Sequence, residues 1–247
     1  MKANHCRPSV DRLKKTSLFQ RRLLAWYDGN RRDLPWRHDH DPYRVWLSEI
    51  MLQQTRVAAV LEHYRTFLRR FPTVKRLASA RESSVLAAWS GLGYYRRARM
   101  LHAAARKIVK DLAGMFPTNA EGLRALPGIG RYTAAAIASI AFDEPVAVVD
   151  GNVERVLQRL LGRNLAGQET WQAAQGLLGR QRPGDFNQAM MELGLRCVCP
   201  AHRCAGPARC LVCVPPAARC SNRERVRPRE SGKFTTRSTA RTDRCSW

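Results

Sequence analysis

The sequence predicts an all-α protein. Apolar residues recur near helical spacing from Asp41 to Phe71, and the same amphipathic pattern returns over about 73–90, 96–112 and 132–141. Glycines and prolines stand between these segments, where they end helices and form turns. No segment of this region has the alternation of apolar and polar residues that is typical of a strand. We therefore expect a succession of helices joined by short loops.

The individual elements follow in chain order. One long helix, or two in succession, covers 41–71, and a short helix over 120–125 precedes a glycine-containing turn. Beyond Phe142 the chain has a short apolar stretch, turns at Asp150-Gly151-Asn152 and continues as a helix to Leu161. Two further helices are expected over 170–178 and 187–195.

Composition and charge narrow the class of protein. The chain has 247 residues, of which 45% are hydrophobic, so it can form one large or two modest domains. Its net charge of +23 indicates a polyanionic partner, and nucleic acid is the leading candidate. No apolar run reaches the roughly 18 to 20 residues of a membrane span, and the first twenty residues lack the apolar stretch of a secretory signal. We expect a cytoplasmic protein without a membrane partner.

The stretch Leu126-Pro127-Gly128-Ile129-Gly130 lies between the short helix and a helix that starts at Arg131. Two glycines allow a sharp turn and a close approach to a ligand, so that the free amides of a helix N-terminus can face an anion. This predicts a helix-hairpin-helix motif that holds a DNA phosphate without reading sequence, through Leu126, Gly128, Gly130 and Arg131. The alternative is a plain loop between packed helices.

Two acids could perform glycosidic chemistry. Glu49 lies in an otherwise apolar helix, where burial would raise its pKa and keep it protonated as a general acid. Asp150 precedes Gly151 at a helix start, where amide donors and the helix dipole favour the ionised form. Cleavage of an N-glycosidic bond needs both a proton for the leaving base and a negative charge beside the sugar cation. Alternatively, Asp150 is only an N-cap and Glu49 a solvated or paired acid.

Five stretches resemble the adenine DNA glycosylases of the MutY type, which share the helix-hairpin-helix superfamily with endonuclease III. They keep one register between about Leu34 and Leu195: LPWR (34–37), DPYRVWLSEIMLQQTRV (41–57), GLGYYRRARMLH (91–102), LPGIGRYTAAAIASIAF (126–142) and VDGNVERVLQRL (149–160).

The resemblance implies a fold of two helical lobes with DNA in the cleft between them. A six-helix barrel with the helix-hairpin-helix motif is expected over 36–142. The second lobe, which bears a cysteine-ligated cluster, is expected to combine 16–35 with 143–220. A tail is expected over 1–15, and the basic segment 221–247 is expected to be disordered.

The resemblance also implies residue roles. Glu49 would protonate a flipped adenine, and Asp150 would stabilise or briefly capture the sugar cation. Tyr132 and Asn152 match residues that assist the reaction, and Trp36 and Arg37 match a wall of the adenine pocket. Gln54 and Tyr94 match residues that enter the duplex where the base leaves, and Gln53 lies beside Gln54 in the sequence. For Tyr94, a core aromatic residue is the alternative.

Tyr132 bears on the reaction type. In related enzymes that also nick the strand, a lysine just after the hairpin attacks the sugar through a Schiff base. This sequence has tyrosine there, and no lysine occurs between Lys110 and Lys233. We therefore expect a monofunctional glycosylase that removes adenine mispaired with 8-oxoguanine or guanine. An endonuclease III-like glycosylase with lyase activity and a non-catalytic DNA-binding protein are the alternatives.

Six of the eight cysteines lie between Cys197 and Cys220, which in a reducing compartment favours a metal or cluster over disulfides. The family carries a [4Fe-4S] cluster with the ligand spacing C-x6-C-x2-C-x5-C. The pair Cys210 and Cys213 keeps this spacing, but six residues separate Cys213 from Cys220 and the first ligand could be Cys197, Cys199 or Cys204. We favour a cluster over zinc or an empty site, and we expect its ligands to be Cys199, Cys210, Cys213 and Cys220. Cys6 and Cys245 are expected to be inert.

The family usually continues into a further domain, which checks the opposite base for 8-oxoguanine. We expect that domain to be absent here, which leaves the selectivity for 8-oxoguanine over guanine open. The partner expected from the resemblance is double-stranded DNA with a mispaired adenine, bound by a monomer.

Overall fold

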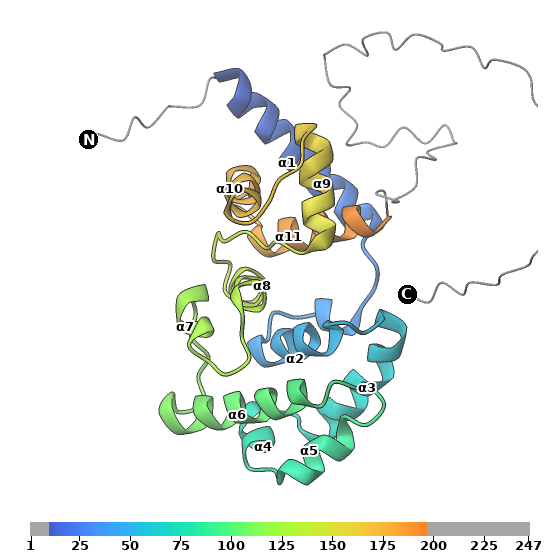
Figure 1. Cartoon of the computed structure of the whole chain (residues 1–247), viewed down its shortest axis with the longest axis vertical. Coiled ribbons are helices and arrows are strands. Elements are labelled where there is room, and N and C mark those ends of the chain that lie inside the picture. Colours follow the sequence, from blue (N-terminus) through green and yellow to red (C-terminus); the bar gives the residue numbers. More distant parts are fainter. Residues whose placement is uncertain (1–9, 197–247) are drawn as a thin grey trace, which may run out of the picture. The chain divides into compact units, whose positions relative to one another are not determined.

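The computed structural model describes the backbone of residues 10–196 and the side chains from residue 16 onward. All regular secondary structure in this part of the chain is helical, which confirms the all-α prediction (Figure 1). None of these helices is long and apolar enough to cross a membrane. The described residues belong to one compact unit of the chain.

Apart from the stretch expected over 73–90, which forms two short helices, the helices follow the sequence pattern. They are α1 (Val10–Asn30), the 3-10 helix η1 (Pro35–Arg37), α2 (Pro42–Leu52), α3 (Val57–Arg70), α4 (Val74–Ala78), α5 (Glu82–Ala88), α6 (Arg96–Asp111), α7 (Ala120–Arg124), α8 (Arg131–Ala141), α9 (Gly151–Leu161), α10 (Gln168–Leu177) and α11 (Pro183–Arg196). The first of them begins within the stretch that the sequence assigned to a tail.

The segment 41–71 forms two helices in succession and not one long helix. Helix α2 stops at Leu52, and Gln54 adopts the left-handed backbone conformation with φ 54°. A residue in this conformation cannot continue a right-handed helix. Helix α3 then starts at Val57, so the two helices meet at a short turn that holds Gln53 and Gln54.

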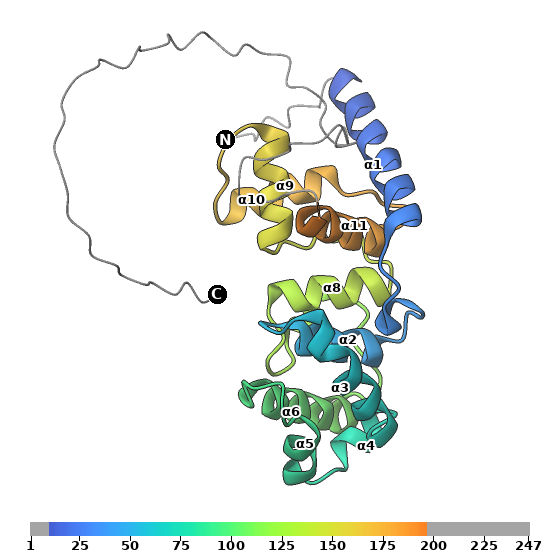
Figure 2. The same ribbon diagram turned by 90° about the vertical axis from the view of Figure 1, so that its right-hand side faces the viewer.

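The helices enclose two hydrophobic cores. The first core is built mainly from α2 to α8 around large side chains such as Trp46, Phe67 and Trp89. The second lies among α1, α9, α10 and α11 around Leu23, Tyr27 and Phe186. Figures 1 and 2 show the corresponding two groups of helices, with α8 beside α11. These are the two helical lobes that the resemblance implied.

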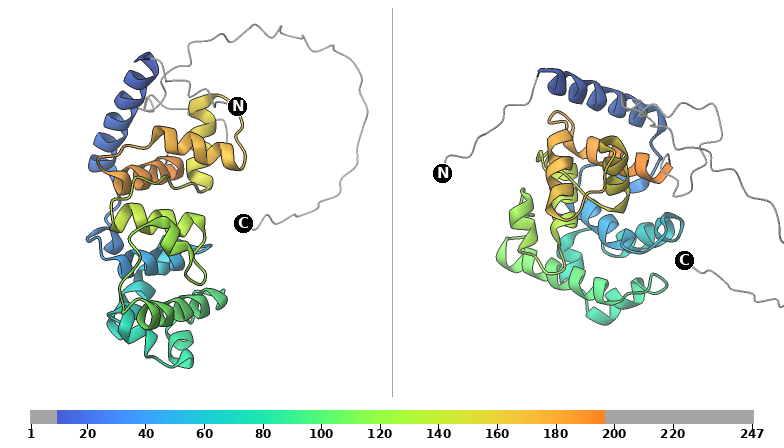
Figure 3. Two further views of the ribbon diagram at one scale, coloured as in Figure 1. Left: turned by 90° about the vertical axis from the view of Figure 1, so that its left-hand side faces the viewer. Right: turned by 45° about the horizontal axis from the view of Figure 1, so that its top comes forward.

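Helix α11 joins the two lobes, because it packs against α1, α8 and α9 (Figure 3). Two of its glycines permit this close approach. A Cβ atom at Gly184 would lie 2.6 Å from the Ser139 carbonyl oxygen of α8, and one at Gly194 would lie 2.4 Å from the Asn152 carbonyl oxygen of α9. Any larger side chain at either glycine would therefore push α11 away from its neighbours.

Candidate active site

Glu49 lies on α2 and is directed into the protein. The helix starts at Pro42, and the Asp41 carboxylate caps it by accepting from the amides of Tyr43 and Arg44 at 2.8 and 3.1 Å. Glu49 is 8% exposed, on a helix whose residues from Val45 to Met51 are all buried. Its position on an apolar helix face therefore forces the carboxyl group out of water.

Burial raises the pKa of Glu49 to about 7. A hydrogen bond from Tyr132 opposes this shift, the negative charge of Asp150 adds to it, and the charge of Arg37 opposes it. The carboxyl group therefore holds its proton up to neutral pH. This agrees with the sequence argument that an apolar helix would keep Glu49 protonated.

Asp150 is the N-cap of α9. One carboxylate oxygen accepts from the Val153 amide at 2.8 Å, and the other accepts from the Asn152 side-chain amide at 2.6 Å. Arg155 donates in turn to the Asn152 side-chain oxygen. The capping role and a catalytic role are compatible, because the cap fixes a half-buried carboxylate whose charge acts on Glu49 and Tyr132.

Tyr132 is the second residue of α8 and interacts electrostatically with both acids. Its pKa is raised well above the usual value by burial and by the charges of Glu49 and Asp150. Its hydroxyl donates to the Met191 sulfur at 3.4 Å and also hydrogen-bonds with Glu49. Side chains from α2, α8 and α9 thus act on one another electrostatically, although about 100 residues separate the two acids in sequence.

A buried ion network stands beside these side chains. The Glu192 side chain on α11 is fully buried and accepts from Arg32 at 2.7 and 2.9 Å, from Arg37 at 3.1 Å and from Arg196 at 3.0 Å. Burial would raise the pKa of Glu192, but the hydrogen bond from Arg32 and the charge of Arg37 lower it. Glu192 therefore holds Arg37, the cation that acts on Glu49. The sequence analysis missed Glu192, since no local spacing relates it to Arg37.

The two predicted wall residues occupy different surroundings. Trp36 is buried in the first core, where its ring lies edge-on to Tyr64 with centroids 5.3 Å apart. Arg37 lies over the Tyr27 ring at 5.6 Å and is close enough to lower the pKa of Glu49. Of the two, Arg37 is the one whose charge acts on Glu49.

Gln53, Gln54 and Tyr94 line a separate pocket of about 630 Å³, which extends to Gly128 of the hairpin. Gln54 and Tyr94 both adopt the left-handed conformation, with φ 54° and 47°, which costs a non-glycine residue on the order of 1–3 kcal/mol. Gln53 donates to the Thr133 hydroxyl at 3.4 Å. Tyr94 is 63% exposed, so it is not a core aromatic residue.

The hairpin connects α7 to α8 as the sequence predicts. Leu126 and Ile129 are buried in the first core, which anchors the turn. Gly128 has φ 74°, and a Cβ atom there would lie 2.6 Å from the Met100 Cβ. Gly130 is the N-cap residue of α8, so the first amides of that helix have no side-chain cap. These amides are the groups that an anion at a helix start would meet.

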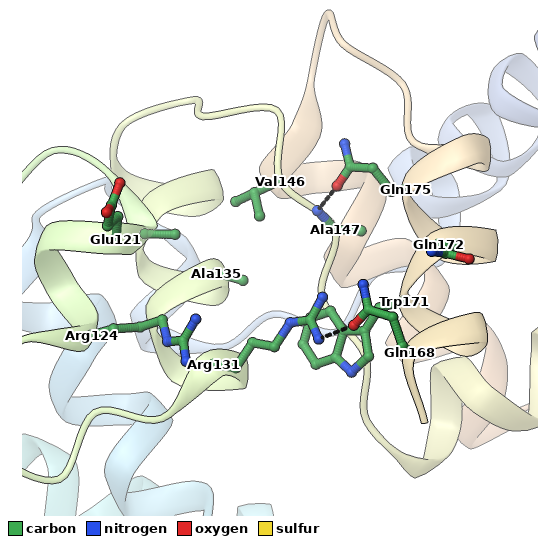
Figure 4. A pocket seen from close by; sticks show the side chains of 11 residues that line it. Glu121, Arg124, Arg131, Ala135, Val146, Ala147, Gln168, Trp171, Gln172 and Gln175 are labelled. Atoms are coloured by element: carbon green, nitrogen blue, oxygen red, sulfur yellow. Dashed lines mark hydrogen bonds between the residues drawn. The ribbon is translucent and has the colours of Figure 1, made fainter. Parts of the chain in front are cut away.

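The Arg131 side chain is directed away from the hairpin and towards α10. Its guanidinium lies over the Trp171 ring at 3.8 Å and donates to the Gln168 side-chain oxygen at 2.7 Å (Figure 4). These residues line a pocket of about 450 Å³ together with Arg124 and Gln175. Arg131 therefore ties the start of α8 to the second lobe.

The predicted cluster ligands Cys199, Cys210, Cys213 and Cys220 lie outside the described residues. Within residues 10–196, no group of three or more histidine, cysteine or acidic side chains could hold a metal ion. Helix α11 ends at Arg196, directly before Cys197.

Comparison with known proteins agrees with this arrangement. The model of a family described as HhH-GPD superfamily base excision DNA repair proteins matches residues 47–176. The chain is 50% identical over 200 residues to the adenine DNA glycosylase of Rattus norvegicus, an alignment that covers 75% of this chain and 39% of that protein. It is 47% identical over 227 residues to the adenine DNA glycosylase of Homo sapiens, covering 86% of this chain and 40% of that protein. The chain thus spans about two fifths of the length of these curated relatives.

Two solved structures share the fold. A thermostable thymine-DNA glycosylase has a TM-score of 0.72 at 31% identity, covering 77% of this chain and 90% of that chain. A trapped covalent intermediate of endonuclease III with DNA has a TM-score of 0.66 at 19% identity, covering 78% of this chain and 92% of that chain. The helix-hairpin-helix motif, the helical lobes and the matched residues lead to one conclusion: the chain belongs to the HhH-GPD superfamily of base excision DNA repair proteins.

Proposed function

We propose that this protein is a monomeric, monofunctional adenine DNA glycosylase, which hydrolyses the N-glycosidic bond of adenine mispaired with 8-oxoguanine or guanine in double-stranded DNA. The adenine DNA glycosylases of Rattus norvegicus and Homo sapiens, at 50% and 47% identity, support the adenine substrate. The observation that carries the proposal is the pairing of a protonated Glu49 with Asp150 across Tyr132.

The two acids suit two different steps. Glu49 donates its proton to the leaving adenine while the glycosidic bond breaks and its electron pair goes to the base. The Asp150 carboxylate stabilises the positive charge that develops on the sugar. Water then adds to the anomeric carbon, and the proton that it loses restores the acid form of Glu49. Asn152, which donates to Asp150 at 2.6 Å, keeps that carboxylate in place.

The base must leave the helix before these acids can act on it. We assign to Gln54 and Tyr94 the role of entering the duplex, where they replace the stacking that is lost when the adenine is extruded. Tyr94 is an exposed aromatic residue, as such a wedge requires. The hairpin amides at Gly128 and Gly130 hold a backbone phosphate nearby. Trp36 and Arg37 contribute to the wall of the adenine pocket.

Tyr132 argues against a lyase. A lyase of this superfamily needs an amine that can form a Schiff base with the sugar. Tyr132 occupies the position after the hairpin, and the chain has no lysine between Lys110 and Lys233. A covalent adduct trapped by borohydride on substrate DNA would contradict the monofunctional assignment.

We also propose that Cys199, Cys210, Cys213 and Cys220 hold a [4Fe-4S] cluster. The donor set supports this, because six cysteines lie within a short segment that directly follows α11. When bound, such a cluster would stabilise the segment around it. No step of base removal needs the cluster.

The test is single-turnover release of adenine from duplexes with adenine opposite 8-oxoguanine, guanine or cytosine. We expect the wild-type protein to release adenine from the first two duplexes and to leave the third intact. Glu49→Gln should bind the DNA and release no base, because an amide is not acidic enough to transfer a proton to the leaving adenine. Glu62→Gln, an exposed acid of α3, is the matched control and should behave as the wild type. Normal release by Glu49→Gln would refute the acid assignment.

A further inference from the structure

Arg97, on the first turn of α6, makes an unusual number of contacts with two separate loops. Its Nη1 atom donates to the carbonyls of Ile50 and Met51 at 3.0 and 3.1 Å, and to that of Gln53. These carbonyls belong to the end of α2, where a helix has no partners of its own for them. Arg97 therefore caps α2 from a different element.

The other guanidinium nitrogen reaches the loop before α6. The Nη2 atom donates to the carbonyls of Leu92 and Gly93 at 3.0 and 3.4 Å and to the Thr55 hydroxyl at 3.1 Å. The guanidinium also lies 5.5 Å from the Trp89 ring centroid and 5.4 Å from that of Tyr94. One side chain thus connects the α2–α3 turn to the α5–α6 loop.

Both connected loops carry a strained residue at the same pocket. Gln54 follows the carbonyl of Gln53 directly, and Tyr94 follows that of Gly93. Gln54 and Tyr94 are two of the four non-glycine residues with positive φ in the described part of the chain. Such conformations persist only where the surrounding structure enforces them. Arg97 donates to the carbonyl of the residue immediately before each strained position.

We propose that Arg97 is a positioning residue, which holds the Gln54 turn and the Tyr94 loop at a fixed separation so that the two side chains enter DNA as one rigid wedge. The inference rests on the proposed function, in which these two residues replace an extruded base. The planar fork of arginine suits this role, because its two terminal nitrogens can bond two loops at once. Both of its terminal nitrogens donate to protein carbonyls or to the Thr55 hydroxyl, so the guanidinium is chiefly engaged within the protein and not with a DNA phosphate.

The experiment compares Arg97→Met with Arg99→Met in the full chain. Arg99 lies on the same helix but is exposed, and its side chain pairs with Glu82 at 3.2 Å, so its variant removes the same charge without changing the contacts that Arg97 makes with the two loops. Adenine release is measured on two duplexes: adenine stacked opposite 8-oxoguanine, and adenine opposite an abasic site, which is easier to extrude. Unstacking is followed separately by the fluorescence of 2-aminopurine opposite 8-oxoguanine.

We expect Arg97→Met to slow release from the stacked duplex by about tenfold to 100-fold, as misplaced groups do, and to slow release from the abasic-site duplex by less than about threefold. The rise in 2-aminopurine fluorescence should shrink in Arg97→Met and persist in Arg99→Met. Equal losses on the two duplexes, or no loss with an unchanged melting temperature, would overturn the proposal.

Arg97→Lys covers the case in which Arg97→Met does not fold. Lysine keeps the charge and part of the hydrogen bonding, so we expect Arg97→Lys to slow adenine release less than Arg97→Met does. The slowing should again be smaller on the abasic-site duplex than on the stacked duplex. A uniform loss on both duplexes would contradict positioning. If the wild-type protein released adenine from neither duplex, the proposed function would fail. The fluorescence comparison needs no cleavage and would still decide the role of Arg97.

Discussion

At the scale of single residues, the pKa of Glu49 links activity to pH. Burial raises this pKa to about 7, so the carboxyl group is protonated below pH 7 and increasingly ionised above it. We expect single-turnover release of adenine to fall by about tenfold per pH unit above this pKa, because only the protonated form donates. A rate that stays constant between pH 6 and pH 9 would contradict the acid role.

The same shift affects stability. In the unfolded chain Glu49 ionises near its ordinary pKa of 4.5, whereas in the folded chain it ionises near 7. Stability is therefore lost as the pH rises through this window, by on the order of 3 kcal/mol once both states are ionised. Glu49→Gln cannot ionise and should unfold at a higher temperature than the wild type at pH 8, with a smaller difference at pH 4.5. Thermal unfolding at both pH values measures this.

At the scale of elements, the packing of α11 against α9 depends on Gly194. A Cβ atom there would lie 2.4 Å from the Asn152 carbonyl oxygen and 2.7 Å from the Asn152 Cβ. We expect Gly194→Ala to destabilise the protein by about 1–3 kcal/mol, and to slow adenine release because Asn152 and Asp150 must shift.

Gly176 on α10 provides the matched control for this substitution. Nothing lies within 4 Å of a Cβ atom at Gly176, so Gly176→Ala should stabilise the helix by about 0.5–1 kcal/mol and leave activity unchanged. Urea unfolding of both variants distinguishes the two effects. If Gly194→Ala had the same free energy of unfolding as Gly176→Ala, α11 could move away from α9 without loss of stability.

At the scale of the whole molecule, the chain combines the described lobes with a cysteine-rich segment after α11. We expect anaerobically purified protein to contain iron and sulfide and to show the broad visible absorbance of a cluster. Cys213→Ser should remove this absorbance, whereas Cys245→Ser should keep it. Zinc in place of iron would contradict the cluster and favour the other use of a C-x2-C pair.

The sequence predicted most of the fold, and it singled out Glu49 and Asp150 as the candidate acids. Helical periodicity and the positions of glycine and proline are local properties, so they indicated most of the helices and the hairpin at Gly128. They did not indicate that 73–90 divides into α4 and α5, or that α1 begins at Val10. The 41–71 segment shows the limit of this approach. The break at Gln54 depends on a left-handed residue that Arg97 supports from another element, and no local pattern indicates it.

By itself, the sequence determined that this protein is helical, strongly basic and equipped with a hairpin and two acids in contrasting local settings. Only the tertiary structure decided that Glu49 is buried, that Tyr132 interacts with both Glu49 and Asp150, and that Glu192 and Arg97 hold the surrounding groups in place. The physical reason is the range of the interactions. Periodicity acts over a few residues, whereas desolvation and charge pairing depend on helices that packing brings together from distant parts of the chain.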